Sequence, residues 1–381
     1  MKKRIMASVM ASVLAIFSLA GCGNGAGGVG GNSYTADNKE FFIGGTGPLT
    51  GDASSYGISA QEGAKLAVKE INANGGLNGI NFKLDMKDDK ATAADAATGY
   101  DTLYEAGMQA SIGAVTSGSC DSFASKANED GIFAMTPSAS AANVIENRPT
   151  VFRVCFGDPD QGYLAAEQLT KEYKKIGAIY DTSDPYSSGI FEAFDSKMKE
   201  LGASFDAQTF DAENKKDFST QVEALKDCDV IFLPIYYTEA GTIAKTAAAK
   251  GCKAVLFGCD GLDGIAGQLD SSVTSQIKYI TPFDVKSTEK VAAKFVEAYK
   301  AEYGKDPDQF AADGYDAIMA IYEAMKKADV KDVTISAEEL CKILVSTITS
   351  PDFKLEGATG IMTWDKTGAC EKEPQIVELN K

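Results

Sequence analysis

The feature that most constrains the fold is a regular alternation, between Lys39 and Asp284, of short apolar runs with longer amphipathic segments. In the longer segments apolar residues recur at helical spacing, as at Ala60, Ala64 and Ala67. The short runs have the length of buried strands, and strands are predicted at residues 41–44, 82–86, 111–115, 132–135, 176–180, 204–210, 230–234, 254–257 and 278–280. Such alternation is typical of an α/β fold in which helices cover both faces of parallel sheets.

The predicted strands are too many for one ordinary sheet, so we expect two lobes. The division is expected at residues 151–160 and again at 281–284. After Asp284 only helices are expected, at residues 289–303, 311–327 and 337–347, and these would cover the first sheet. The predicted lobes are residues 39–155 plus 285–362 and residues 156–284 plus 363–381. Repeated crossings between two rigid lobes form a hinge, which indicates closure around a ligand.

Hydroxyl side chains follow two of the predicted strands at the point where each strand ends. Thr116, Ser117 and Ser119 follow the first, and Ser138 and Ser140 follow the second. In an open α/β sheet, ligands bind beyond the carboxyl ends of the strands, and the amides of a following helix favour an anionic group there. The alternative for any single Ser or Thr is that it caps a helix or shapes a turn.

The first residues have the pattern of a signal peptide. Three basic residues precede an uncharged stretch at residues 5–20, and the stretch is shorter than a membrane span requires. The tetrad Leu-Ala-Gly-Cys that ends at Cys22 resembles a bacterial lipobox, so we expect cleavage after residue 21 and a lipid on Cys22. Residues 22–38 are predicted to be a Gly-rich linker. The protein would then be held at the outer face of the cell membrane; an ordinary secretory signal is the alternative.

Charge and cysteine content exclude several classes of protein. Cleavage after residue 21 would change the formal net charge from −17 to −20, because it removes three basic residues and no acidic one. Such a surface repels nucleic acid. The chain has no His, and seven Cys remain beyond Cys22 without a close cluster. We therefore expect neither a metal site nor a cofactor, and the odd number of Cys leaves any disulfide pairing open.

Seven motifs occur in one order along the chain: GTGPLTG (45–51), AVKEINANGGLNG (67–79), GAVTSGS (113–119), TPSAS (136–140), YYTEAG (236–241), GCDG (258–261) and DGYDA (313–317). Together they resemble the branched-chain amino-acid-binding (Leu/Ile/Val) type of ABC-transporter substrate-binding lipoprotein, over residues 40–370. The resemblance implies two doubly wound parallel-sheet lobes joined by a three-strand hinge, the type I periplasmic-binding fold. It also implies a monomer that delivers an amino acid, most simply a branched-chain or aliphatic one, to permease subunits in the membrane.

The resemblance also implies which residues hold the ligand. The carboxylate site of the family falls on Ser117 and on Ser138, Ala139 and Ser140. The acidic partner of the ligand ammonium falls on Asp260, which precedes Gly261 and is also typical of a simple turn.

Aromatic residues of the family's cleft are expected at five tyrosines. These are Tyr56, Tyr186, Tyr236, Tyr237 and, as a residue that closes the pocket from the later helices, Tyr315. Tyr236 and Tyr237 are adjacent, and adjacent residues of an extended segment point to opposite sides. At most one of the two should therefore face the ligand.

An enzyme is not expected from this sequence. Without His no Ser-His-Asp triad is possible, and the S-x-x-K at Ser196 lies in a charged helical segment with no S-D-N elsewhere. Two alternatives remain open at this stage. The same fold could bind a short amide, a urea-like compound or an aromatic acid, or the chain could sense a ligand for a receptor rather than a permease.

Overall fold

A computed structural model describes residues 39–379, all of which belong to one compact unit. The predicted signal peptide, the lipid site at Cys22 and the linker lie outside the described residues. In the described part of the chain, no helix has the length and apolar content needed to cross a membrane.

The first lobe is built on a five-stranded parallel sheet with the strand order β2-β1-β3-β4-β5. Its strands are β1 (Glu40–Gly47), β2 (Asn81–Asp88), β3 (Ala110–Ser111), β4 (Phe133–Thr136) and β5 (Val151–Arg153). Successive residues of β1 alternate between the two faces of the sheet. Phe41 and Ile43 pack into one core with α1 (Ser54–Ala73) and α10 (Gln309–Lys327), while Phe42 packs into another with α2 (Ala93–Glu105) and α3 (Ser117–Glu129).

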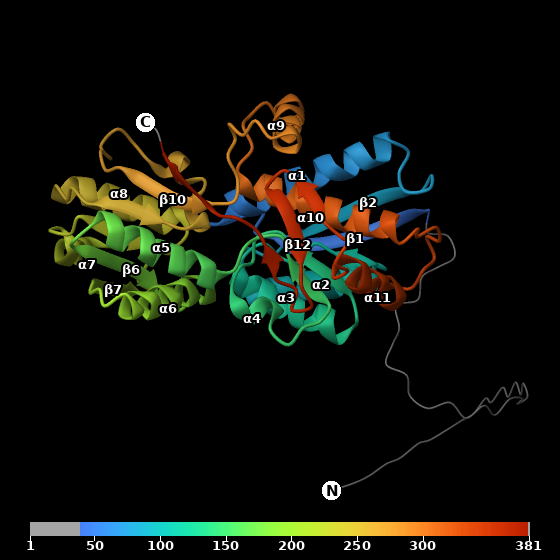
Figure 1. Cartoon of the computed structure of the whole chain (residues 1–381), viewed down its shortest axis with the longest axis horizontal. Coiled ribbons are helices and arrows are strands. Elements are labelled where there is room, and N and C mark those ends of the chain that lie inside the picture. The colour runs from blue at the N-terminus through green and yellow to red at the C-terminus, as the bar shows by residue number, and fades with distance from the viewer. Residues whose placement is uncertain (1–38, 380–381) are drawn as a thin grey trace, which may run out of the picture. The chain divides into compact units, whose positions relative to one another are not determined.

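Two glycines allow α1 and α10 to pack unusually closely (Figure 1). A Cβ atom at Gly63 would lie 1.8 Å from the carbonyl oxygen of Ala311, and one at Gly314 would lie 2.2 Å from that of Ala60. The contact therefore requires glycine on both helices, and it joins the later part of the chain to the first lobe. Three further helices belong to this part of the structure: α4 (Ala142–Ile145), α9 (Lys290–Tyr303) and α11 (Ala337–Ile348).

The second lobe is built on a six-stranded sheet with the order β14-β10-β9-β8-β6-β7. Five strands are parallel: β6 (Ile176–Asp181), β7 (Asp206–Phe210), β8 (Val230–Leu233), β9 (Val255–Gly258) and β10 (Ile277–Thr281). β14 (Gln375–Glu378) pairs antiparallel with β10. The helical segments are α5 (Asp158–Glu172), α6 (Pro185–Glu200), α7 (Ser219–Leu225), α8 (Tyr237–Lys250), η1 (Asp260–Leu262) and η2 (Ile265–Gln268).

Both faces of this second sheet are also covered. Val230 and Phe232 of β8 share a core with α5 and α6, while Ile231 and Leu233 share one with α7 and α8. The predicted α/β fold of two doubly wound lobes is thus confirmed. In Figure 1 the strands of the first lobe are blue to green, and the helices of the second lobe are green to yellow.

The prediction that only helices follow Asp284 is wrong. A small antiparallel sheet is formed by β11 (Leu355–Gly357), β12 (Gly360–Trp364) and β13 (Cys370–Glu371), and β14 follows. These strands have two to five residues. β11, β12 and β13 mix exposed with buried positions, and β14 has no buried residue, so none of them carries a buried apolar run. β5 was not predicted either; its three residues lie where the division between the lobes was expected.

Three chain segments pass between the two lobes, after β5, after β10 and between β13 and β14. The division into residues 39–155 plus 285–362 and 156–284 plus 363–381 stays a proposal. Its boundary after residue 362 falls inside β12, whereas the third crossing comes later, before β14.

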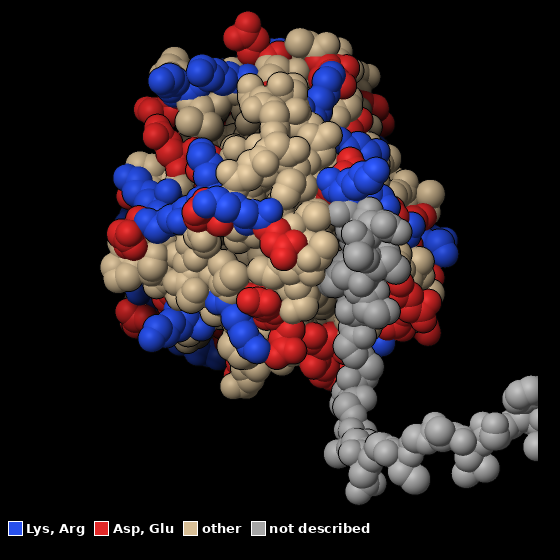
Figure 2. All heavy atoms as spheres, turned by 90° about the vertical axis from the view of Figure 1, so that its right-hand side faces the viewer, with Lys and Arg blue, Asp and Glu red and all other residues tan. Residues whose placement is uncertain are grey.

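Charges of both signs are interspersed on the face drawn in Figure 2, with no large region of one sign. Many exposed charges of the described chain are paired, for example Lys126 with Asp101 at 2.8 Å and Lys327 with Asp352 at 2.7 Å. Such exposed pairs contribute little to stability, so the lobes depend on their apolar cores.

Candidate functional site

A small cavity lies where the loops at the carboxyl ends of both sheets meet. It is lined by Tyr56, Val115, Thr116, Ser117, Ser138, Tyr186, Tyr236, Asp260, Gly261 and Phe310. Its free volume is about 10 Å³, which is room for about one water molecule. Six of the predicted site residues are therefore brought together, and they come from both lobes.

The first lobe contributes hydroxyl groups and the start of α3. The hydroxyl of Ser138 donates to the carbonyl of Val115 at 2.8 Å, and the hydroxyl of Ser117 accepts from the amide of Ala141 at 3.2 Å. The Thr116 side chain makes no capping hydrogen bond to α3, and the first turn of that helix holds no acidic residue. Polar amides at an uncapped helix start favour a carboxylate.

Ala139 and Ser140 do not line the cavity. The amide of Ala139 donates to the Thr136 hydroxyl at 3.1 Å, so it braces the loop. The carbonyl of Ser140 accepts from the Arg153 guanidinium and from the amide of Asp158. The Ser140 hydroxyl is buried and has no hydrogen-bond partner among residues 39–379.

The second lobe contributes a carboxylate at Asp260, in the 3₁₀ turn that follows β9. Asp260 is only 4% exposed, and its Oδ1 accepts from the Tyr186 hydroxyl at 2.7 Å. Burial raises the pKa of Asp260 to about 6. Polar contacts of its carboxylate with Tyr186 and Gln161 partly oppose that rise. A ligand ammonium beside Asp260 would favour its charged form.

Aromatic rings form the wall between the two polar ends. Tyr56 lies 4.2 Å from Phe310 and 5.6 Å from Tyr236, measured between ring centroids. Tyr186 and Tyr236 are stacked at 4.9 Å. Together with Val115, which also lines the cavity, these rings are suited to an apolar side chain.

Two predicted tyrosines lie outside the cavity lining. The ring of Tyr237 packs edge-on against Tyr56 at 4.8 Å, and its hydroxyl accepts from the amide of Ser55. Of the adjacent pair, only Tyr236 lines the cavity. The hydroxyl of Tyr315 donates to Glu70 at 2.7 Å and its ring packs against Phe295, so it joins α10 to α1 and α9 instead of closing the pocket.

Several functional candidates were missed in the sequence. Gln161 accepts from the amide of Asp260 at 3.0 Å, and Gln309 donates to its carbonyl at 2.6 Å. Asp158 is 1% exposed, and neither of its carboxyl oxygens has a partner in the described chain. No local sequence pattern indicates that two glutamines far apart in the chain contact the same residue. Asp158 is one of the acidic residues at the start of α5, a pattern typical of ordinary helix capping.

The cysteines near the cleft are packed residues. Cys120 lies in the first turn of α3 and is 1% exposed, and burial raises the pKa of its thiol to about 11. Cys259 precedes Asp260 and is also buried, with a raised thiol pKa. The seven Cys in the described part of the chain are all unpaired.

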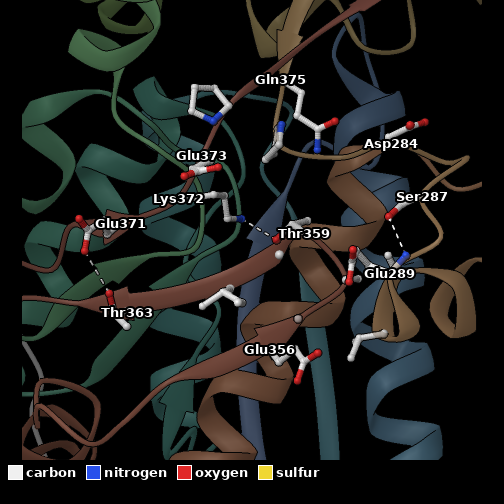
Figure 3. Close-up of a pocket in the computed structure, with 18 residues that line it drawn as sticks. Asp284, Ser287, Glu289, Glu356, Thr359, Thr363, Glu371, Lys372, Glu373 and Gln375 are labelled. Carbon is white, nitrogen blue, oxygen red and sulfur yellow. Dashed lines mark hydrogen bonds between the residues drawn. The ribbon is translucent and has the colours of Figure 1, made fainter.

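Larger cavities also occur in the described structure, and two of them bear on the choice of site. One of about 460 Å³ shares Tyr186 and Tyr236 with the small cavity and opens beside Lys90 and Lys215. The other, of about 880 Å³, lies between the crossing segments and is lined by carboxylates such as Glu371 (Figure 3). The buried ammonium of its Lys372 points to Thr359, at 2.6 Å. This larger cavity contains none of the predicted site residues, so the small cavity remains the candidate site.

Within residues 39–379, His, Cys, Asp and Glu form no group of three or more that could hold a metal ion.

Comparison with known proteins shows extensive similarity. A family model described as periplasmic binding protein matches residues 40–364. A Leu/Ile/Val-binding protein of Rhizobium johnstonii is 26% identical over 345 residues, which cover 87% of this chain and 89% of the relative. A leucine-binding protein structure from Thermotoga maritima is 27% identical with a TM-score of 0.79, and the match covers 88% of this chain and 94% of that one. A branched-chain amino acid transporter substrate-binding protein from Streptococcus pneumoniae, in complex with isoleucine, is 29% identical with a TM-score of 0.76, covering 90% of this chain and 100% of that one.

Proposed function

Because the chain belongs to the periplasmic binding protein family, we propose that it is the extracytoplasmic solute-binding component of an ABC importer and captures an aliphatic amino acid. One observation carries the ligand class. The small cavity is lined by hydroxyls and a helix start from one lobe, by a buried carboxylate from the other, and by aromatic and aliphatic side chains. The similarity to Leu/Ile/Val-binding relatives supports the same class.

In this proposal the ligand carboxylate binds first, at the start of α3 beside Ser117 and Ser138. Asp260 then arrives with the second lobe and pairs with the ammonium, and the side chain lies among Tyr56, Tyr186 and Tyr236. A cavity of about 10 Å³ cannot hold an amino acid, so the lobes must separate for entry and settle around the ligand afterwards. Closure is driven by contacts that exist only when both lobes touch the ligand.

The anchor and partners are part of the same proposal. A lipid on Cys22 and the Gly-rich residues after it would tether a monomer to the outer face of the cell membrane, beside the permease subunits. The chain itself performs no catalysis, and energy for transport comes from the ATPase subunit of the importer.

Titration calorimetry with the twenty common L-amino acids, benzoate and small amides tests the ligand. We expect binding of leucine, isoleucine or valine, and a loss of about 100-fold in affinity in Asp260→Ala, because a buried charge would lose its partner. Binding of benzoate or an amide with undiminished affinity in Asp260→Ala would instead assign an amine-free ligand. Absence of binding to every L-amino acid would refute the proposed ligand class.

A further inference from the structure

The peptide of Asp260 and Gly261 is held by side chains from four helices. From the second lobe, Gln161 of α5 accepts from the amide of Asp260, and the Tyr186 hydroxyl of α6 accepts from the amide of Gly261 at 2.8 Å. From the first lobe, the Tyr56 hydroxyl of α1 donates to the carbonyl of Gly261, and Gln309 of α10 donates to that of Asp260. Side chains of both lobes thus fix the backbone of one ligand-facing acid.

Gln309 has a special place among these four residues. It is 1% exposed at the first position of α10, directly after the capping residue Asp308. Its amide nitrogen Nε2 lies 2.6 Å from the carbonyl oxygen of Asp260, while its Oε1 accepts from the Thr281 hydroxyl at 2.8 Å. Its backbone amide donates to Asp263 at 2.9 Å, so the same residue contacts both ends of the 3₁₀ turn.

Neither end of the Gln309 side chain is required for the turn itself. The carbonyl of Asp260 also accepts from the amide of Asp263 at 3.0 Å, and the Thr281 hydroxyl lies 3.3 Å from the carbonyl of Phe283. Without the Gln309 amide, both groups would keep a partner. The hydrogen bond from Gln309 to Asp260 is therefore not needed to form the turn, but it fixes how the turn is oriented.

We propose that Gln309 is a positioning residue for amine recognition: from the first lobe it holds the Asp260 turn of the second lobe in the orientation that receives the ligand ammonium. This inference rests on the proposed function, since Asp260 meets an ammonium only if the ligand is an amino acid. Gln309 itself does not line the cavity, so it would act on the ligand through Asp260. Its contribution should therefore appear in the selectivity for amines.

The test compares Gln309→Met with the unchanged protein, because Met keeps the length of Gln and removes its polar ends. Calorimetry is done with L-leucine and with its amine-free analogue, 4-methylpentanoate. We expect Gln309→Met to weaken L-leucine about tenfold, the effect of one buried hydrogen bond, and to change 4-methylpentanoate by less than about twofold. Thr281→Val should shift the selectivity in the same direction by a smaller factor, and Gln276→Met, at an exposed glutamine, should change neither ligand.

Equal losses for both ligands, or no loss for either, would overturn the role of Gln309. If the unchanged protein binds neither L-leucine nor any other L-amino acid, the proposed function fails, and hydrogen exchange of the ligand-free protein tests the role of Gln309 separately. Faster exchange at the amides of residues 260–263 in Gln309→Met, with the rest of the second lobe unchanged, would support the positioning role. Identical exchange in the two proteins would refute it.

Discussion

The Tyr186 hydroxyl donates a 2.7 Å hydrogen bond to Asp260 and at the same time accepts from the amide of the next residue, Gly261. A Cβ atom at Gly261 would lie 2.7 Å from that hydroxyl and 2.9 Å from the carbonyl oxygen of Ile235, so the contact requires glycine. One phenol thus fixes both the carboxylate and the turn that carries it. The electrostatics of the site depend on this pair.

Ligand binding should weaken at low pH. Burial raises the pKa of Asp260 to about 6, and an ammonium pairs only with the ionised carboxylate. Affinity for L-leucine should therefore be nearly constant above about pH 7 and fall by about tenfold per pH unit below 6. Calorimetry between pH 4.5 and 8 measures this pH dependence of the affinity. The variant Asp260→Asn should bind L-leucine weakly at every pH. A flat profile in the unchanged protein would contradict the role of Asp260.

Tyr186→Phe should make the loss of affinity for L-leucine begin at a higher pH. The hydrogen bond from Tyr186 lowers the pKa of Asp260, so its loss raises the pKa further and less carboxylate is ionised at a given pH. At pH 7 we expect an affinity about tenfold lower than in the unchanged protein. Tyr163→Phe, at a tyrosine that is 44% exposed, is the matched control. If both variants share one pH profile, the hydroxyl of Tyr186 does not tune Asp260.

The sequence predicted the lobes because buried parallel strands are continuous apolar runs. Residues 230–233 and 255–258 are fully or nearly buried, and runs of this kind are visible without a structure. β14 is different, since it pairs with β10 at the edge of a sheet and most of its residues are exposed. Its register depends on the third crossing, which no local pattern encodes.

The same reasoning explains which parts of the site were predicted. Ser117, Ser138 and Asp260 follow buried strands, so topology alone carries them to one edge. Gln309 begins a helix more than 40 residues after Asp260, and only the packing of α10 on α1 brings the two together. Tyr315 follows Gln309 on the same helix but faces Glu70, because a helix turns its residues to different sides.

Cys22→Ala should release the protein from the membrane. The lipid predicted from the tetrad that ends at Cys22 is expected on the sulfur of Cys22, and this single change removes that sulfur. Cell fractionation should find the unchanged protein with membranes and the variant in the soluble or secreted fraction, while mass spectrometry of the unchanged protein should show a lipid on Cys22. Retention of the variant on membranes would contradict the anchor.

Gly314→Ala should destabilise the first lobe. The added methyl group would lie 2.2 Å from the carbonyl oxygen of Ala60, and only movement of α10 away from α1 relieves that overlap. Overpacking of this kind costs about 1–3 kcal/mol, which urea unfolding resolves. Gly267→Ala is the matched control, because a Cβ atom there meets no atom within 4 Å. Equal stability of the two variants would show that the helices separate without cost.

Asp158→Asn should stabilise the protein at neutral pH. Burial is the largest influence on Asp158 and raises its pKa, which the nearby Ser140 hydroxyl and Arg153 charge partly offset. For such an acid the folded state binds the proton more tightly than the unfolded state. The contribution of Asp158 to stability is therefore greatest below about pH 4, where the carboxyl is protonated in both states, and is lost as pH rises toward the raised pKa.

Asn carries no charge, so the variant should escape this loss. We expect it to exceed the unchanged protein by about 1–3 kcal/mol at pH 7, the cost of an unpartnered buried polar group, and to match it at pH 4. The negative charge at the start of α5 that is given up contributes less, about 0.3–1 kcal/mol. Urea unfolding at both pH values measures the difference, with Asp195→Asn on the solvent side of α6 as control. If the stability of Asp158→Asn relative to the unchanged protein is instead lower at pH 7 than at pH 4, Asp158 is ionised and partnered in the folded chain.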